Sequence, residues 1–422
     1  MIEAILAEFS GSERVAEAAR KAAWALEPRD LDVRARIRMR VVSAFLEEGL
    51  AESDLAGTTG YGYDDAARTR YESLLARVFR GDRALARLTF ASGTHAIVTT
   101  LAACAAPGET ILSAAGRPYD TLHHALVTAP YSLVSTGVGY AEVELDPQLR
   151  FDPVALAESL ATSTPRVIFV QRSRGYSPRP SLAIAEIEEL VNVVRSFAPN
   201  IFIVVDNCYG EFVEEREPLE VGADAIVGSL IKNVGGGLAP TGAYVVGSAE
   251  VIERVAARHY APGLGTALGP SLGFGRALVQ GLFAAPAIVG ESLRGLDFAA
   301  ALFSELGFEV EPLAGAPRSD TVQAISLGSA DALLRFARGL QQTLPINAKF
   351  APVPGAVPGY VDEVVMSSGA FVAGSTLELS CDGPLRPPFQ VYLQGGTLAE
   401  HVALGALSAA DAVLKGPEAE QR

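Results

Sequence analysis

Apolar and polar positions alternate along this chain with two different periods. Between about residues 85 and 250, short apolar runs that suit buried strands alternate with longer segments of helical period. This alternation is typical of a parallel sheet covered by helices, and it predicts an α/β domain. The expected strands are ARLTF, TILSA, VIFVQ, IFIVV, DAIVG and AYVVG, which begin at Ala86, Thr110, Val167, Ile201, Asp224 and Ala243.

The segments on either side have different patterns. Residues 1–60 show helical spacing but too few elements for a domain, so we expect an N-terminal helical arm. The large α/β domain is expected over 61–290 and a smaller C-terminal α+β domain over 291–422, joined by a long helix around 280–305. Two domains also suit a chain of 422 residues. The strands expected in the small domain are FEVEP, TVQAISL and TLELS.

Composition and charge limit the possible partners. The chain has 34 Lys and Arg against 49 Asp and Glu, which argues against nucleic acid because phosphate binding needs a basic face. The three cysteines and five histidines show neither a disulfide framework nor metal-ligand spacing, so we expect no metal. Neither a signal peptide nor an apolar run of roughly 18 to 20 residues is visible, so we expect a cytoplasmic protein with no membrane contact.

An acid and a lysine follow two neighbouring apolar strands. Asp206 closes the strand that begins at Ile201, and Lys232 comes shortly after the strand that ends near Gly228. In open α/β sheets, ligands bind outside the carboxyl ends of the strands, so both side chains are expected at one edge of the sheet. The lysine suits covalent attachment of an aldehyde cofactor, and the aspartate suits a partner for the pyridinium nitrogen of that cofactor.

Further polar residues follow other expected strands. Ser92, Gly93 and Thr94 stand at a helix start, where exposed N–H groups bind phosphate, although a plain helix cap has the same pattern. Ser229, in the lysine loop, offers another hydroxyl. Tyr119 could stack on a flat ring, although simple packing is also compatible with its position.

A loop rich in glycine and tyrosine, Gly57–Tyr63, precedes a helix that begins near Asp64 and Asp65. Aspartate favours turns and N-caps, so the loop is compatible with a simple turn. Its two tyrosines, Tyr61 and Tyr63, could instead present their hydroxyl groups to a phosphate.

The motifs that carry a family resemblance are GYGYDD, ASGTHAI, GRPYDTL, QRSRGY, DNCYGEF, GSLIKNVGGG and GPLRPPFQVYLQGG. Together these motifs resemble the fold-type I pyridoxal-phosphate enzymes of cysteine and methionine metabolism, in particular the branch of aluminium-resistance or methionine gamma-lyase family proteins. The resemblance implies a mostly parallel seven-stranded sheet in the large domain and pyridoxal 5'-phosphate as cofactor. It also implies carbon–sulfur lyase activity of the cystathionine beta-lyase or methionine gamma-lyase type on a sulfur-containing L-amino acid, giving a thiol, ammonia and a 2-oxo acid.

The same resemblance implies a role for each candidate residue. Lys232 would form the Schiff base with the cofactor, and its freed amine, with a pKa lowered by burial and nearby positive charge, would take the Cα proton. Asp206 would contact the pyridinium nitrogen, and Tyr119 would stack on the ring and act in catalysis. The residues that would bind the phosphate are Ser92, Gly93, Thr94 and Ser229.

Two further roles implied by the resemblance concern the substrate and a second subunit. Arg386 would hold the substrate α-carboxylate bidentately, a geometry that suits arginine. Tyr61 and Tyr63 would reach the phosphate in a neighbouring subunit. We therefore expect a homo-oligomer, with a dimer as the smallest catalytic unit and a tetramer as the assembly.

Departures from the family pattern bear on the substrate. Relatives with established lyase activity usually show SGM, DNT and a Thr-Lys pair, whereas this chain has SGT, DNC and Ile231–Lys232. The thiol of Cys208 in DNC is either reactive or simply a small buried group.

Other functions are compatible with parts of the pattern. The same cofactor chemistry could give γ-substitution, aminotransfer or racemisation, and a cofactor-binding protein with little turnover could serve resistance or homeostasis. Gly263–Gly265 weakly suggests a nucleotide-binding oxidoreductase, but the strand before it and the acid after it that such a motif needs are missing.

Overall fold

The structure, a computed structural model, describes residues 1–416, so the last residues of the expected small domain, 417–422, lie outside it. The chain divides into two compact units. The large unit is Ala35–Pro286, and the small unit combines Met1–Arg34 with Ala287–Arg422. Helices α3 (Leu31–Glu48) and α10 (Gly275–Glu305) both run from one unit into the other.

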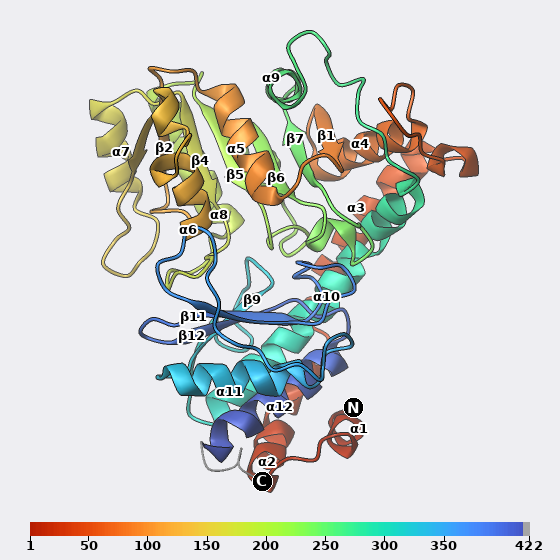
Figure 1. Ribbon diagram of the computed structural model, residues 1–422, viewed down its shortest axis with the longest axis vertical. Helices are drawn as coiled ribbons and strands as arrows, with labels where there is room; N and C mark the ends of the chain where they lie inside the picture. The colour runs from red at the N-terminus through yellow and green to blue at the C-terminus, as the bar shows by residue number, and fades with distance from the viewer. Residues whose placement is uncertain (417–422) are drawn as a thin grey trace. The chain divides into compact units, whose positions relative to one another are not determined.

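The large unit is built on a seven-stranded sheet with the order β1-β7-β6-β5-β4-β2-β3 (Figure 1). The neighbouring pairs from β6 to β3 are parallel, whereas β7 runs antiparallel to both β6 and β1. The mostly parallel seven-stranded sheet expected from the sequence is therefore confirmed. Its strands are β1 (Arg83–Arg87), β2 (Thr110–Ser113), β3 (Gly139–Glu142), β4 (Val167–Gln171), β5 (Phe202–Asp206), β6 (Ala225–Ser229) and β7 (Ala243–Gly247).

Helices cover both faces of this sheet, which explains why its strands are apolar almost throughout. On one face, α5 and α9 join a core with alternate strand residues such as Val204 and Val245. On the other face, Phe79 of α4 stacks on Tyr244 of β7. The helices of this unit are α4 (Ala66–Phe79), α5 (Gly93–Cys104), α6 (Asp120–His123), α7 (Pro153–Thr162), α8 (Ile184–Phe197) and α9 (Ala249–His259).

The register of the central strands brings their last residues together. Gln171 of β4 pairs with Asp206 of β5, and Asp206 in turn pairs with Val227 of β6. Strand β6 ends at Ser229, and Lys232 follows in the next turn. Because these three strands are parallel, their carboxyl ends meet at one edge of the sheet, where ligands bind in this class of fold.

The small unit contains a five-stranded antiparallel sheet with the order β10-β11-β12-β9-β8. Helices α11 and α12 pack on each other, and the N-terminal helices α1 and α2 pack on α12. Its elements are α1 (Ile2–Ala7), α2 (Glu13–Ala22), β8 (Glu309–Glu311), β9 (Val322–Ser326), α11 (Ala330–Gln341), β10 (Val364–Ser368), β11 (Ser380–Pro384), β12 (Gln390–Gln394) and α12 (Ala399–Lys415).

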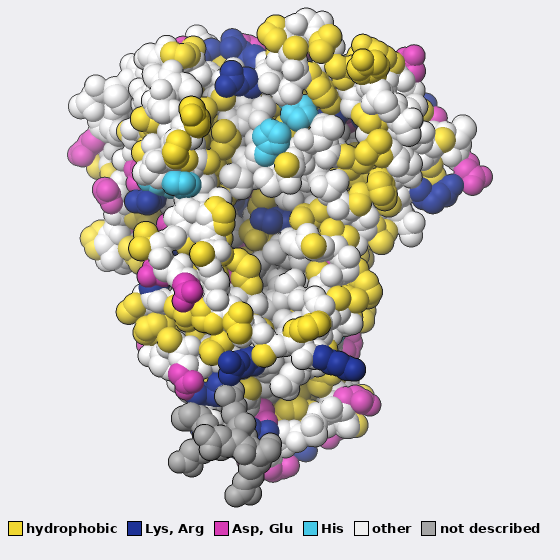
Figure 2. All heavy atoms as spheres, in the orientation of Figure 1, with side chains coloured by type: hydrophobic (Ala, Val, Ile, Leu, Met, Phe, Trp, Pro, Cys, Tyr) yellow, Lys and Arg dark blue, Asp and Glu magenta, His cyan; other side chains and the backbone are white. Residues whose placement is uncertain are grey.

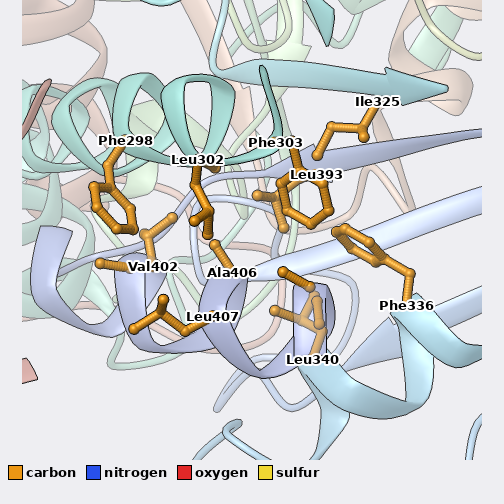
Figure 3. Close-up of a cluster of buried hydrophobic side chains, with 14 of the residues drawn as sticks. Phe298, Leu302, Phe303, Ile325, Phe336, Leu340, Leu393, Val402, Ala406 and Leu407 are labelled. Atoms are coloured by element: carbon orange, nitrogen blue, oxygen red, sulfur yellow. The ribbon is translucent and has the colours of Figure 1, made fainter. Parts of the chain in front are cut away.

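The core of the small unit lies between its sheet and its helices (Figure 3). Each helix turns one apolar face to this core, because residues three or four positions apart share a face. The side chains that meet there are Phe298, Leu302 and Phe303 of α10, Phe336 and Leu340 of α11, Val402, Ala406 and Leu407 of α12, and Ile325 and Leu393 of the sheet.

Some strand predictions are wrong in detail. The first expected strand begins at Ala86, whereas β1 is Arg83–Arg87 and the apolar residues after it lie in a turn. The TLELS segment only reaches the start of β11, whose sequence SCDGP has the composition of a turn. Strands β3, β10 and β12 were not expected, because their short runs mix apolar and polar residues without a clear period.

The surface carries mixed charges on the face shown in Figure 2, where positive and negative side chains are interspersed. Within residues 1–416, no helix is both long and apolar enough to cross a membrane. The same residues contain no group of three or more His, Cys, Asp or Glu side chains arranged to hold a metal ion.

Candidate functional site

The phosphate turn expected from the sequence lies at the N-terminus of α5. The hydroxyl of Ser92 caps the helix by accepting a hydrogen bond from the backbone N–H of His95 (3.1 Å). The N–H groups of Gly93 and Thr94 lie in the first turn, where a helix offers no carbonyl partner. A Cβ on Gly93 would stand 3.4 Å from the Cβ of Ser229, so the helix start and the end of β6 lie side by side.

Tyr119 lies next to this turn. Its hydroxyl and that of Thr94 share a hydrogen bond of 2.7 Å, and its backbone N–H donates to the side-chain carbonyl of Gln171 (2.8 Å). Burial, with the Asp206 charge nearby, raises the pKa of the Tyr119 hydroxyl well above its ordinary value. The tyrosine therefore stays protonated at neutral pH. Hydrogen bonds hold it in place through both its hydroxyl and its backbone N–H.

Asp206 ends β5 with its side chain almost fully buried. One carboxylate oxygen accepts a hydrogen bond from the backbone N–H of Cys208 (3.1 Å), which any residue except proline could donate at position 208. Burial raises the pKa of the Asp206 carboxyl, while the nearby Lys232 opposes this rise. Burial also raises the pKa of the Cys208 thiol well above its usual value, so Cys208 is a protonated, buried side chain rather than a reactive thiolate.

Lys232 extends its amine over the ring of Tyr209, with 3.9 Å between Nζ and the ring centroid. Burial acts to lower the pKa of the amine, but the surrounding Cys208, Tyr209 and Asp206 raise it well above its usual range. The lowered pKa expected from the sequence refers to the amine freed from the cofactor during the reaction, and it stays a prediction. Burial by itself lowers the pKa of an amine, but the acidic and aromatic neighbours of Lys232 act in the opposite direction and outweigh it.

The segment after Asp206 holds Tyr209 in an unusual conformation. Tyr209 and Phe212 both have left-handed backbone angles, with φ of 69° and 64°. Such angles cost a residue other than glycine about 1–2 kcal/mol, and they persist where the surrounding structure holds them in place. The ring of Phe212 packs on Phe79 from α4, which anchors the far side of the segment.

A buried ion-pair network holds this segment from beneath. The fully buried guanidinium of Arg172 donates to the side-chain carbonyl of Asn207 (2.8 Å) and to the backbone carbonyl of Gly210 (3.0 Å). It also pairs with Glu214 (2.8 Å) and lies 3.6 Å from Glu217.

Glu217 completes the network from the other end of the segment. It accepts hydrogen bonds from the backbone N–H of Phe212 (2.9 Å) and from the amide of Asn207 (3.0 Å), and it lies 3.4 Å from Arg40. Burial raises the pKa of the Glu217 carboxyl, and Arg172 opposes this rise. Two opposite charges with no access to water therefore fix the loop that carries Tyr209.

A second buried carboxyl, Glu211, lies beneath the lysine turn. One of its oxygens accepts a hydrogen bond from the hydroxyl of Tyr244 (2.7 Å), and its backbone carbonyl accepts one from Asn233 (3.1 Å). Gly228 is required here, because a Cβ would stand 2.5 Å from the Tyr244 hydroxyl. Burial raises the pKa of Glu211 to about 8.

We expect Glu211→Gln to change how stability depends on pH. The unfolded carboxyl loses its proton near pH 4.5, whereas the folded one keeps it up to about pH 8, so wild-type stability falls as pH rises through that window. Glutamine mimics the protonated carboxyl at every pH. The stability difference between variant and wild type should be close to zero at pH 4.5 and grow to about 4 kcal/mol at pH 8.

Urea unfolding at pH 5 and pH 8 would measure this difference. Glu215→Gln is the matched control, since Glu215 is exposed, is paired with Arg36, and has a pKa lowered by that pairing. A gain for Glu211→Gln that is equal at both pH values would contradict the assignment of a buried, protonated Glu211.

Tyr61 and Tyr63 lie on a separate, rigid part of the large unit. Asp65 accepts hydrogen bonds from Thr58 and Ser271, which lowers the pKa of its carboxyl to about 2 even though burial acts in the opposite direction. Arg68 donates to the backbone carbonyl of Gly62, as well as to Ala267 and Gly269. The loop is therefore fixed.

Both tyrosines point to the surface of this loop. Tyr61 and Tyr63 are 77% and 56% exposed, with ring centroids 6.0 Å apart. Within residues 1–416, no hydrogen bond or ring contact joins either of them to Lys232 or Asp206. Their predicted contact with the phosphate in a second subunit stays a prediction, and such an exposed pair is free to make it.

Arg386 belongs to the small unit, in the turn after β11. Its guanidinium lies 3.7 Å from the carboxylate of Asp362, and its backbone carbonyl accepts a hydrogen bond from Phe389. Its predicted role in holding the substrate carboxylate stays a prediction.

The large unit therefore brings together the phosphate-turn residues, Tyr119, Asp206, Ser229 and Lys232. Reasoning from sequence missed the residues that hold them: Gln171, Arg172, Tyr209, Glu211 and Glu217. The motifs QRSRGY and DNCYGEF contain four of these, so the signal was present as a motif, but nothing in it distinguishes a buried charge from a solvated one.

These side chains fit pyridoxal phosphate. The helix start, with the hydroxyls of Thr94 and Ser229, is a set of donors suited to a dianion. The gap that Gly93 leaves against Ser229 and Cys208 lets an anion approach the backbone. The buried carboxylate of Asp206 needs a cation beside it, which a protonated ring nitrogen supplies, and Lys232 provides the amine for an aldehyde.

Comparison with known proteins agrees with this fit. A sequence model of the methionine gamma-lyase family matches residues 14–414. The uncharacterised protein YnbB of Bacillus subtilis is 41% identical over 388 residues, which cover 91% of this chain and 92% of that protein.

Two solved structures are similar over almost their whole length. A candidate cystathionine beta-lyase involved in aluminium resistance from Clostridium acetobutylicum is 37% identical, with a TM-score of 0.92 and coverage of 97% of this chain and 98% of that one. A carbon–sulfur lyase involved in aluminium resistance from Clostridium novyi is 36% identical, with a TM-score of 0.91 and the same coverage. This chain belongs to the methionine gamma-lyase family, a family of carbon–sulfur lyases that use pyridoxal phosphate.

Proposed function

We propose that this chain eliminates a thiol from a sulfur-containing L-amino acid and releases ammonia and a 2-oxo acid. The observation that carries the proposal is the position of Lys232. Its amine stands in the same buried cluster as Asp206 and Tyr119, beside a helix start suited to a phosphate. The names of the two Clostridium structures, which refer to carbon–sulfur bond cleavage, support the sulfur substrate.

Each residue then has a defined task. The N–H groups of Gly93 and Thr94, with the hydroxyl of Ser229, would bind the cofactor phosphate. Asp206 would hold a proton on the ring nitrogen, and Tyr119 would hold the cofactor ring in place. The bound cofactor supplies an electron sink that makes the Cα–H bond of the amino acid acidic.

Lys232 moves the protons of the reaction. Its Nζ takes the Cα proton of the substrate, the carbon–sulfur bond breaks, and the departing sulfur leaves as a thiol once it is protonated. Water then converts the remaining unsaturated amine into a 2-oxo acid and ammonia, so no oxidant or reductant is needed. Asp206 would be partly neutralised by the protonated ring nitrogen that it holds, which would reduce its effect on the pKa of Lys232 and let the amine act as a base.

The oligomer and the substrate clamp are also part of the proposal. Tyr61 and Tyr63 would complete the phosphate site of a second copy of the chain, which agrees with their exposure on a fixed loop. Arg386 would bind the α-carboxylate of the substrate. Size-exclusion chromatography with light scattering of wild type and Tyr61→Ala/Tyr63→Ala tests the first of these assignments.

The activity is tested by adding single amino acids to the purified, cofactor-loaded protein. L-cystathionine, L-cysteine and L-methionine should each be incubated with it while the absorbance is recorded, and thiol, ammonia and 2-oxo acid should be quantified. Equal amounts of all three products from at least one of them are expected. Thiol without ammonia would indicate substitution, and loss of optical activity without thiol would indicate racemisation. Either result would contradict the proposed elimination.

A further inference from the structure

We propose that Tyr209 is a positioning residue that holds the released amine of Lys232 against the face of its aromatic ring. This inference rests on the proposed role of Lys232 in the reaction. The amine of that lysine must leave the cofactor when the substrate binds, act on the substrate, and then return. It therefore needs a position between these steps that is close to the site but easy to leave.

The geometry shows where that position is. Nζ of Lys232 lies 3.9 Å from the centroid of the Tyr209 ring, well within the range over which an ammonium group is attracted by an aromatic face. A carboxylate at this place would bind the ammonium more firmly. The carboxylate of Asp206, which also acts on this amine, is assigned to the ring nitrogen of the cofactor in the proposed function.

The backbone of Tyr209 shows that its position is enforced. Its φ of 69° is unfavourable for a tyrosine, and the residues on both sides are fixed by buried groups. Arg172 binds the side chain of Asn207 and the carbonyl of Gly210, and Glu217 binds Asn207 and the N–H of Phe212. This network explains why the ring stays beneath the amine.

Several titratable groups act on the amine of Lys232, so a test must separate the effect of the Tyr209 ring from the effects of the others. Besides Tyr209, the titratable side chains coupled to Lys232 are Asp206, Cys208, Tyr119 and Glu211. Because a ring face favours the charged amine, removing the ring lowers the pKa of Lys232 while the other groups remain. The uncharged amine is the form that reacts with an aldehyde, so removing the ring should speed attachment of the cofactor.

The experiment uses the full-length protein stripped of cofactor. Pyridoxal phosphate is added between pH 6 and pH 10, the reaction is quenched with borohydride, and the modified peptide that carries Lys232 is quantified by mass spectrometry. For Tyr209→Leu, we expect the pH dependence of the attachment rate to move down by about one unit, which gives about tenfold faster attachment at pH 8. Tyr209→Phe, which keeps the ring, should follow the wild type.

A second pair of variants guards against a change in folding. Phenylalanine and pentafluorophenylalanine at position 209 have nearly the same shape, but fluorination removes the negative potential of the ring face. The fluorinated variant should shift as Tyr209→Leu does. A pH dependence that is the same for phenylalanine and pentafluorophenylalanine would overturn the inference about Tyr209 alone. Absence of any attachment at Lys232 in the wild type would overturn the proposed function and this inference with it.

Discussion

Replacing Lys232 by alanine is expected to abolish covalent attachment of the cofactor and to lower turnover about a thousandfold or more. General acid–base catalysis alone contributes about 10²–10⁴-fold, and this variant also loses the attachment point. The chain has four lysines, and Lys232 is the only one in the large unit, so no neighbouring amine can take its place. Absorbance of the loaded protein and release of thiol from the best substrate would measure both effects.

Two controls make the result for Lys232 specific. Lys232→Arg keeps a positive charge over Tyr209 but cannot form the bond to an aldehyde, so it should be as inactive as alanine. Lys349→Ala removes an exposed lysine of the small unit and should leave the absorbance and turnover of the wild type unchanged. Wild-type turnover by Lys232→Ala would refute the assignment of this residue.

Replacing Arg172 by methionine is expected to lower the free energy of unfolding by about 3–5 kcal/mol, because removing one partner from a buried ion-pair network leaves its carboxylate charge only partly compensated. Glu217 is fully buried and keeps Arg40 but loses its second cation, while the carbonyl of Gly210 loses a donor. The segment that carries Tyr209 should loosen first. Urea unfolding followed by circular dichroism, with hydrogen exchange of residues 207–217, would measure both effects.

The control for this variant is Arg216, an arginine of the segment that carries Tyr209. Arg216 pairs with Glu188 at the surface through two short contacts, and exposed pairs contribute little, so Arg216→Met should hardly change the unfolding midpoint. Adding Glu217→Gln to Arg172→Met should recover part of the lost stability, since it removes a buried charge that has lost one of its two arginine partners. An unchanged midpoint in Arg172→Met would show that the buried pair does not hold the loop.

The sheet and the residues at its edge could be predicted because local pattern determines them. A continuous apolar run is typical of a strand that is buried on both faces of a parallel sheet. The residue that ends such a run lies at the carboxyl end of the strand. Asp206 and Lys232 were found in this way. The register that pairs Gln171 with Asp206 depends on strands far apart in the chain. The sequence alone therefore could not show that Gln171 is the polar residue that binds the backbone of Tyr119.

The network under Tyr209 could not be predicted for a different reason. The segment VEEREPLE has the composition of a solvated acidic loop. Part of the segment is indeed solvated, since Glu215 is exposed and paired with Arg36. Glu217, two residues later, is fully buried. Spacing does not separate them, because the loop follows neither a helical nor a strand period, and the fold alone determines which carboxyl meets Arg172.

The small unit combines two stretches that lie far apart in the chain, and this has a consequence for folding during synthesis. Its first part, Met1–Arg34, is synthesised long before its packing partners, since Asp411, which accepts a hydrogen bond from the N–H of Ser12, comes 399 residues later. The large unit is one continuous stretch and can fold while synthesis continues. At about 5–20 residues per second, the N-terminal helices wait for many seconds with an uncovered apolar face. During this interval the nascent chain should be a client of chaperones that bind near the ribosome exit.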